Sequence, residues 1–153
     1  MARKHIAMTP DEQHDFLVSG RNLQVATLGI DGWPHLTTLW YVVIDGSITF
    51  RSFSKSQRIV NLTREPRLTV LVEAGTGYES LQGVMIKGTA HISTERHDVL
   101  DAYHRVTAKY QNRDVTREVV EQMFGAHADK NAVVTVEPRS VISWDHRKLA
   151  GGY

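Results

Sequence analysis

Cysteine is absent from this chain of 153 residues, which excludes disulfide bonds and thiolate chemistry. That absence agrees with a reducing compartment, and we expect a cytoplasmic protein. No apolar run approaches the roughly 20 residues needed to cross a bilayer, and no apolar core of a signal peptide follows the first residues. Charge of one sign is also lacking, because 18 Lys and Arg stand against 17 Asp and Glu. We therefore expect neither a membrane nor a nucleic acid as partner.

Metal-ligand spacing is missing too, although the chain has eight histidines. His97 and His104 are seven residues apart, which places them two helical turns from each other and too far apart to share an ion. Nothing matches His-Glu-x-x-His. We predict no metal. Ordinary contents of 41% hydrophobic and 23% charged residues predict one globular domain over residues 1–153.

Two Asp-Gly pairs punctuate the first third of the chain. Asp31-Gly32 and Asp45-Gly46 are typical hairpin turns, and each lies between stretches rich in β-formers. Two such turns in succession predict an antiparallel meander. Its three strands are expected at residues 23–30, 33–44 and 47–53.

The remaining pattern adds strands and helices in alternation. Thr9 and Glu12 form a capping box for a first helix that ends at Gly20. Gly83 and Gly88 are expected bend points in a later strand, and Pro138 is expected to separate the last two strands. Further strands are expected at 67–73, 81–92, 131–137 and 139–145, with helices in 54–65 and 95–124. The fold class is mainly β with α (α+β), and we expect a mostly antiparallel sheet that closes into a barrel with the helices packed outside.

A strand-to-helix junction at residues 49–62 concentrates positive charge. Ser54 and Gln57 fit a capping box, so we predict that the helix begins there. Free N–H groups and the helix dipole make such a start suited to a phosphate, although a solvated basic turn is the alternative reading. Neither a P-loop nor a dinucleotide-binding glycine pattern is present. The cations of the junction are Arg51, Lys55 and Arg58, beside the hydroxyls of Ser52, Ser54 and Ser56.

Several motifs in order resemble a known family. The series begins Asp31-Gly32-x-Pro34-His35-x-Thr37-x-x-Trp40 and Asp45-Gly46, and continues Ile48-x-Phe50-x-Ser52-x-x-Lys55, Asn61-Leu62-x-x-x-Pro66-Arg67 and Gly83-Val84-x-Ile86-x-Gly88-x-Ala90. It resembles the split β-barrel of pyridoxamine-phosphate-oxidase-like proteins. The ending Ser143-Trp144-Asp145-x-x-Lys148-Leu149-x-Gly151 resembles the flavin/deazaflavin oxidoreductases that use coenzyme F-420. The resemblance covers about residues 10 to 153.

This resemblance implies a homodimer with cofactor sites at the subunit interface. Asn61 would hold the helix in place, and Trp144 and Lys148 would come from around the partner site. The polyanionic tail of coenzyme F-420 would find further cations among Arg64, Arg67, Arg147 and Lys148. The phosphate would bind Arg51, Ser52, Lys55, Ser56 and Arg58, and the ring would be lined by Pro34, Leu36, Thr37 and Thr38.

The implied activity is hydride transfer from the reduced deazaflavin to an electron-poor small molecule. An FMN-dependent oxidase or reductase on the same barrel is the alternative. A non-catalytic carrier of a cofactor, haem or tetrapyrrole is the third reading. No nucleophile or triad is found, and the catalytic residues remain unassigned. His35, Tyr41, Tyr78 and solvent stay open as proton donors.

Overall fold

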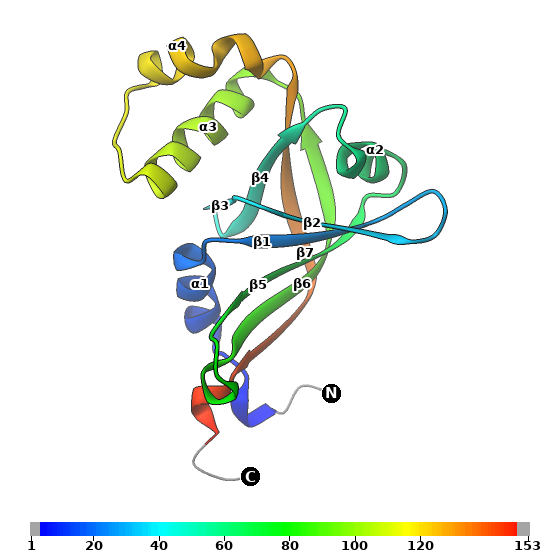
Figure 1. Cartoon of the computed structure of the whole chain (residues 1–153), viewed down its shortest axis with the longest axis vertical. Coiled ribbons are helices and arrows are strands. Elements are labelled where there is room, and N and C mark those ends of the chain that lie inside the picture. Colours follow the sequence, from blue (N-terminus) through cyan, green and yellow to red (C-terminus); the bar gives the residue numbers. More distant parts are fainter. Residues whose placement is uncertain (1–3, 150–153) are drawn as a thin grey trace.

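Seven antiparallel strands form one curled sheet in the computed structural model, which describes residues 4–149 (Figure 1). Four α-helices accompany the sheet within that range. The strand order is β2-β1-β5-β6-β7-β4-β3, and every pairing is antiparallel. This confirms the α+β split barrel. The strands are β1 (Leu23–Leu28), β2 (Pro34–Leu39), β3 (Val42–Ile44), β4 (Ser47–Phe53), β5 (Arg67–Ala74), β6 (Gln82–Ser93) and β7 (Asn131–Asp145). The helices are α1 (Pro10–Ser19), α2 (Gln57–Arg64), α3 (Arg96–Gln111) and α4 (Arg117–Ala128), with 3-10 turns η1 (Lys4–Ile6), η2 (Tyr78–Ser80) and η3 (His146–Lys148).

The predicted strand at residues 33–44 is wrong as a single strand. It is divided into β2 and β3, which lie at opposite edges of the sheet, with only Trp40 and Tyr41 between them. Both Asp-Gly hairpins form, but the predicted meander does not, because β2 pairs only with β1 and β3 only with β4. The two-residue connection brings the sheet's two edges together and curls it into a barrel. Tyr41 is fully buried and donates its hydroxyl to the Leu17 carbonyl at 2.5 Å.

The last strand is continuous where two strands were predicted. β7 runs through Pro138 and pairs with β6 along its length. Pro138 lies opposite Gly88, where the β6–β7 register shifts, so its missing N–H falls at an irregularity of the ladder. The bend predicted at Gly88 is confirmed. Gly83 instead lies in regular pairing against Trp144, and a Cβ there would overlap the indole ring.

Helix α2 begins two residues later than the Ser54 cap predicted. Its N-cap is Ser56, and the capping box of Ser54 with Gln57 does not form. Ser54 instead donates both its N–H, at 2.9 Å, and its hydroxyl, at 3.0 Å, to the carbonyl of Lys130. Ser54 therefore extends the contact of β4 with β7, and the chain turns into the helix only after it. The other predicted box, Thr9 with Glu12 on α1, is confirmed.

The main core fills the barrel interior. Alternate residues of β1, β5 and β7 point inward, and α2 adds Ile59 and Leu62, which are 5% and 1% exposed. A second cluster, around Val99, Tyr103 and Val120, lies under α3 and α4. Val133 of β7 belongs to it, whereas its neighbour Val134 faces the barrel, so the helical pair packs on the outer side of the sheet. Within the described residues, no helix has the length and apolar character of a membrane span.

Candidate functional site

Four polar side chains from three elements meet where β4 passes into α2. Arg58 donates from Nη1 to the Ser52 hydroxyl at 2.7 Å and from Nε to the Thr37 hydroxyl at 3.1 Å. The hydroxyls of Ser52 and Ser56 lie 2.8 Å apart. Three of the five predicted phosphate ligands, Ser52, Ser56 and Arg58, are thus together, joined by Thr37 of β2. We call these four residues, with the adjacent Lys55, the α2 corner.

The backbone at this corner also presents hydrogen-bond donors. Ser56 caps α2 without a side-chain hydrogen bond, and the first turn contains no acidic residue. The N–H groups of Gln57, Arg58 and Ile59 bond to no other group of the described residues. Free first-turn N–H groups carry the positive end of the helix dipole, so they favour an anion.

The cations of the α2 corner have no carboxylate partners among residues 4–149. Lys55 is exposed and makes no ion pair or hydrogen bond within residues 4–149, and Arg58 bonds only to hydroxyls. Burial lowers the pKa of Arg58 because it removes water from the guanidinium. An arginine that is half-buried beside hydroxyls, with no acid to neutralise it, is arranged to receive an anion such as phosphate.

The predicted tail-binding cations contrast with the corner. Arg67 pairs with Glu65 at 2.8 Å, and Arg147 pairs with Asp145 at 2.7 Å. These hydrogen bonds lower the pKa of both carboxyls. A third candidate, Arg64, donates to a backbone carbonyl, that of Leu28.

Arg51 lies away from the other predicted phosphate ligands. Neighbouring residues on a strand point to opposite faces, and Arg51 therefore points toward α3 while Ser52 points toward α2. Its guanidinium donates to Asn131 Oδ1 at 2.7 Å, and its central carbon lies 4.1 Å from the centre of the Tyr103 ring. Within one chain, the structure does not bring Arg51 to the α2 corner.

The same alternation divides the predicted ring-lining residues of β2. Thr37 pairs with the fully buried Val25 and faces the barrel, where it meets Arg58. Leu36 pairs with Ala26 and is 67% exposed, so Pro34, Leu36 and Thr38 share the outer face. A groove of about 560 Å³ continues that face across β1, β5 and β6, with Pro34 in its wall.

Trp144 and Lys148 lie far from the α2 corner in the chain that holds them. β7 runs from α4 at one end to η3 at the other, and these two residues belong to the η3 end (Figure 1). The Trp144 indole packs on Gly83. Lys148 donates to the Ala7 carbonyl at 3.0 Å and pairs with Glu12 at 2.5 Å, and this hydrogen bond lowers the pKa of Glu12. Gly151 of the motif and the predicted tail at 150–153 lie outside the described residues.

The candidate proton donors differ in their placement. Tyr41 is engaged with Leu17, and burial raises its pKa, so its hydroxyl is a poor donor near neutral pH. Tyr78 lies on η2, against His146 in an edge-to-face contact. His35 shares the inner face of β2 with Thr37, and its buried Nδ1 has no partner among the described residues. His35 is thus the candidate that lies beside the α2 corner.

Asn61 joins α2 to the barrel, and Asn61→Ala should destabilise the fold. The side chain is fully buried, donates to the Thr27 hydroxyl at 3.0 Å and accepts from Gln57 at 2.8 Å. Its removal leaves a buried hydroxyl without its partner, which costs about 1–3 kcal/mol. Urea unfolding would measure the loss. Thr63→Ala, an exposed change on the same helix, should stay within about 0.5 kcal/mol of the parent, and equal effects of the two variants would contradict this role for Asn61.

Lys109 on α3 is a buried amine that the sequence pattern did not single out. Its Nζ lies 3.9 Å from the centre of the Tyr41 ring and has no hydrogen-bond partner within the described range. Desolvation, with a smaller contribution from Arg21, lowers its pKa from 10.5 to about 8. The folded chain therefore releases this proton at lower pH than the unfolded chain.

This difference predicts a pH dependence of stability. Between pH 8 and 10 the unfolded state binds more protons at Lys109 than the folded state, so the free energy of unfolding should rise with pH. After allowance for solvent screening, we expect a rise on the order of 1 kcal/mol. Urea titrations at several pH values would show it for the parent chain and for the exposed control Lys130→Met. If the free energy of unfolding still rose with pH in Lys109→Met, a group other than Lys109 would be responsible for the pH dependence.

A curled antiparallel sheet of this strand order, with helices packed outside it, is a split barrel. The family model for pyridoxamine 5'-phosphate oxidase matches residues 9–145, and the chain belongs to this family. No curated protein matches the chain.

Solved structures agree with that membership. A conserved hypothetical protein from Mycobacterium tuberculosis is 38% identical, with a TM-score of 0.90, over 100% of this chain and 94% of that one. An F-420 reductase is 16% identical, with a TM-score of 0.66, over 84% of this chain and 94% of that one. A heme storage protein from Vibrio cholerae is 11% identical, with a TM-score of 0.66, over 87% of this chain and 93% of that one. The last two share the fold with this chain.

Proposed function

We propose that this protein is a cytoplasmic oxidoreductase that uses coenzyme F-420 to reduce an electron-poor small molecule. The observation that carries the proposal is the α2 corner, where two cations without carboxylate partners adjoin hydroxyls and free helix N–H groups. Coenzyme F-420 has a phosphate with a polyanionic tail, which this chemistry suits. The ending around Trp144 favours the deazaflavin, and an F-420 reductase shares the fold.

In this proposal the residues of the α2 corner and of β2 bind the cofactor and fix its orientation. Arg58, Ser52 and Ser56 hold the phosphate, and Lys55 adds charge that water screens only in part. The bound deazaflavin supplies the hydride. Thr37 connects the phosphate end to β2, and the ring reaches Pro34, Leu36 and Thr38 on the outer face of β2 around the open edge of this strand. Exclusion of water and a fixed orientation are then the protein's contribution to the rate.

We also propose a homodimer. Near the β1–β2 hairpin Ile30, Trp33 and Leu36 are 85%, 74% and 67% exposed, which is more apolar surface than a free strand edge usually presents. A second copy covering this face would bury it. The partner subunit's Trp144 and the partner subunit's Lys148 could then approach the α2 corner, which the same residues cannot reach within their own chain. Sedimentation velocity should show a dimer at micromolar concentration.

FMN is the alternative cofactor, because its phosphate would fit the α2 corner equally well and the matching family model is that of pyridoxamine 5'-phosphate oxidase. The experiment is a parallel titration of the purified protein with coenzyme F-420, FMN and haem, followed by tryptophan fluorescence and calorimetry. We expect micromolar or tighter binding of the deazaflavin and at least tenfold weaker FMN. Preference for FMN would select the alternative. Preference for haem would contradict both and favour a non-catalytic haem-binding protein, and one protein of this fold is named as a heme storage protein.

A further inference from the structure

A second, smaller pocket lies on the opposite side of β4 from the α2 corner. Its volume is about 170 Å³, and its walls are Leu39, Trp40, Arg51 and Val106. These residues come from the β2–β3 junction, from β4 and from α3. Because Arg51 and Ser52 face opposite ways on β4, a ligand in this pocket does not share the groups that form the α2 corner.

Arg51, which lines this pocket, has guanidinium N–H groups that donate to no acceptor among the described residues. Nη1 is committed to Asn131 at 2.7 Å, and the guanidinium rests on the Tyr103 ring. The buried Nε has no partner among the described residues, and no hydrogen bond from Nη2 is found there either. No carboxylate of the described range pairs with Arg51. The Nε–Nη2 edge of a guanidinium is the edge that binds a carboxylate with two parallel hydrogen bonds.

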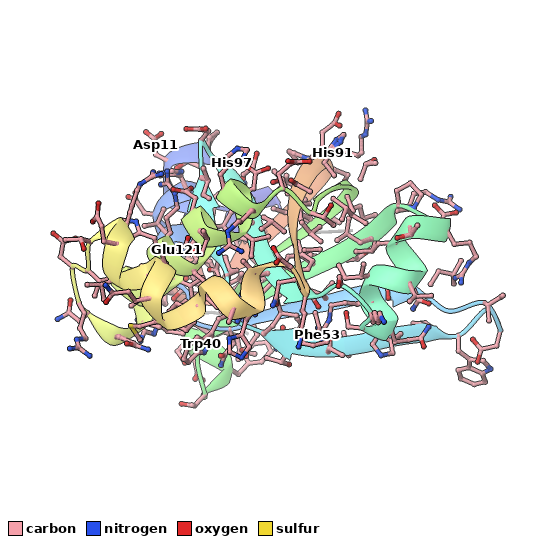
Figure 2. All side chains as sticks on the ribbon, turned by 90° about the horizontal axis from the view of Figure 1, so that it is seen from above. Asp11, Trp40, Phe53, His91, His97 and Glu121 are labelled. Atoms are coloured by element: carbon pink, nitrogen blue, oxygen red, sulfur yellow. The ribbon has the colours of Figure 1, made fainter. Side chains whose placement is uncertain are left out.

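Trp40 supplies a rigid aromatic wall. Its ring stacks on Tyr110, with centroids 4.4 Å apart and planes 11° from parallel, yet 52% of the residue is exposed. Tyr110 is itself anchored, since its hydroxyl accepts from the Tyr41 N–H at 3.0 Å and lies within hydrogen-bond distance of the Arg21 and Tyr41 carbonyls. Figure 2 labels Trp40 apart from Phe53, which lies near α2. Because Tyr110 stacks on one face of the Trp40 indole and fixes its position, the other face can stack against the ring of a ligand.

We propose that this pocket binds a small aromatic carboxylate, with the carboxylate on Arg51 and the ring against Trp40, Leu39 and Val106. The volume suits a single ring, since a cavity of about 150 Å³ accepts benzene. Leu39, Trp40 and Val106 offer the ring apolar contacts, and Arg51 offers the carboxylate its polar contact. The inference stands whether or not the α2 corner binds coenzyme F-420.

The test uses benzoate as the probe and its neutral isostere benzamide as the matched control, both titrated calorimetrically into the full-length protein. We expect benzoate to bind with a millimolar or lower dissociation constant and benzamide at least tenfold more weakly. Arg51→Met, which keeps an apolar stem over Tyr103, should weaken benzoate at least tenfold. Trp40→Ala should weaken benzoate and benzamide alike, because it removes the stacking surface common to both.

Cross-controls separate this site from the cofactor site. Arg51→Met should leave coenzyme F-420 affinity within about twofold of the parent, and Arg58→Ala should leave benzoate affinity equally unchanged. The proposal is overturned if benzoate shows no binding at 10 mM, on the order of the affinity expected of a nine-atom ligand, or binds Arg51→Met as well as the parent. It is also overturned if Arg51→Met loses both ligands while it keeps its melting temperature, because the pocket would then belong to the cofactor site.

Discussion

Replacing Lys55 and Arg58 together with alanine is expected to weaken coenzyme F-420 binding more than a hundredfold. Each side chain offers a charge-assisted contact worth about 1–3 kcal/mol, and neither has a carboxylate partner whose loss would offset the change. Lys55→Ala alone should cost about tenfold and Arg58→Ala more, because only Arg58 also orients the hydroxyls of Ser52 and Thr37. Isothermal titration at low and moderate salt would measure both losses, and the loss for Lys55 should shrink as salt rises.

The control is Arg113→Ala, an exposed cation on the α3–α4 connection. It changes the net charge as much as either single variant but should leave the affinity unchanged. The thermal midpoint of the double variant should fall by no more than about 8 °C, because Lys55 is exposed and contributes little stability, whereas the half-buried Arg58 loses two hydrogen bonds of about 1 kcal/mol each. If the double variant bound coenzyme F-420 and FMN as tightly as the parent, the phosphate would not lie at the α2 corner.

Gly83→Ala is expected to lower the free energy of unfolding by about 2–3 kcal/mol, the cost of overpacking a filled site. A Cβ at Gly83 would overlap the Trp144 indole, and the two residues are direct partners in the β6–β7 ladder, so neither can move aside without disturbing the pairing. Trp144→Ala removes the obstacle. The double variant should therefore lose less stability than the sum of the two single changes. Urea denaturation of the four chains completes the cycle.

Gly77→Ala is the matched glycine control. A Cβ there would meet its nearest atom, in Glu79, at 3.6 Å, which is ordinary contact, and the residue has no positive φ. This variant should be as stable as the parent or slightly more so. If Gly83→Ala proved equally harmless, the indole would have room to shift, and the close packing of Trp144 would not be what requires glycine.

Local signals predicted the local structure well. The Asp45-Gly46 hairpin forms with positive φ at both residues, as its turn type requires, and the Thr9 capping box forms on α1. The Ser54 capping box met the same sequence rule and did not form, because the Lys130 carbonyl, 76 positions away, took both Ser54 donors. A pattern of a few residues cannot anticipate a competing partner from a distant strand.

The sequence by itself determined the class of protein. The absence of cysteine, the stretches rich in strand-forming residues between the Asp-Gly turns, and the ordered motifs through Trp144 are all local features that can be recognised along the chain. It also placed cations and hydroxyls at one strand-to-helix junction. Only the tertiary structure decided which of them act together. Strand alternation sent Arg51 to one side of β4 and Ser52 to the other, and sheet closure brought Thr37 to Arg58. Long-range pairing likewise joined Lys148 to Glu12, whereas Lys55 and Arg58 have no acidic partner in the described part of the chain, because neutralisation depends on distance in space and not on separation along the chain.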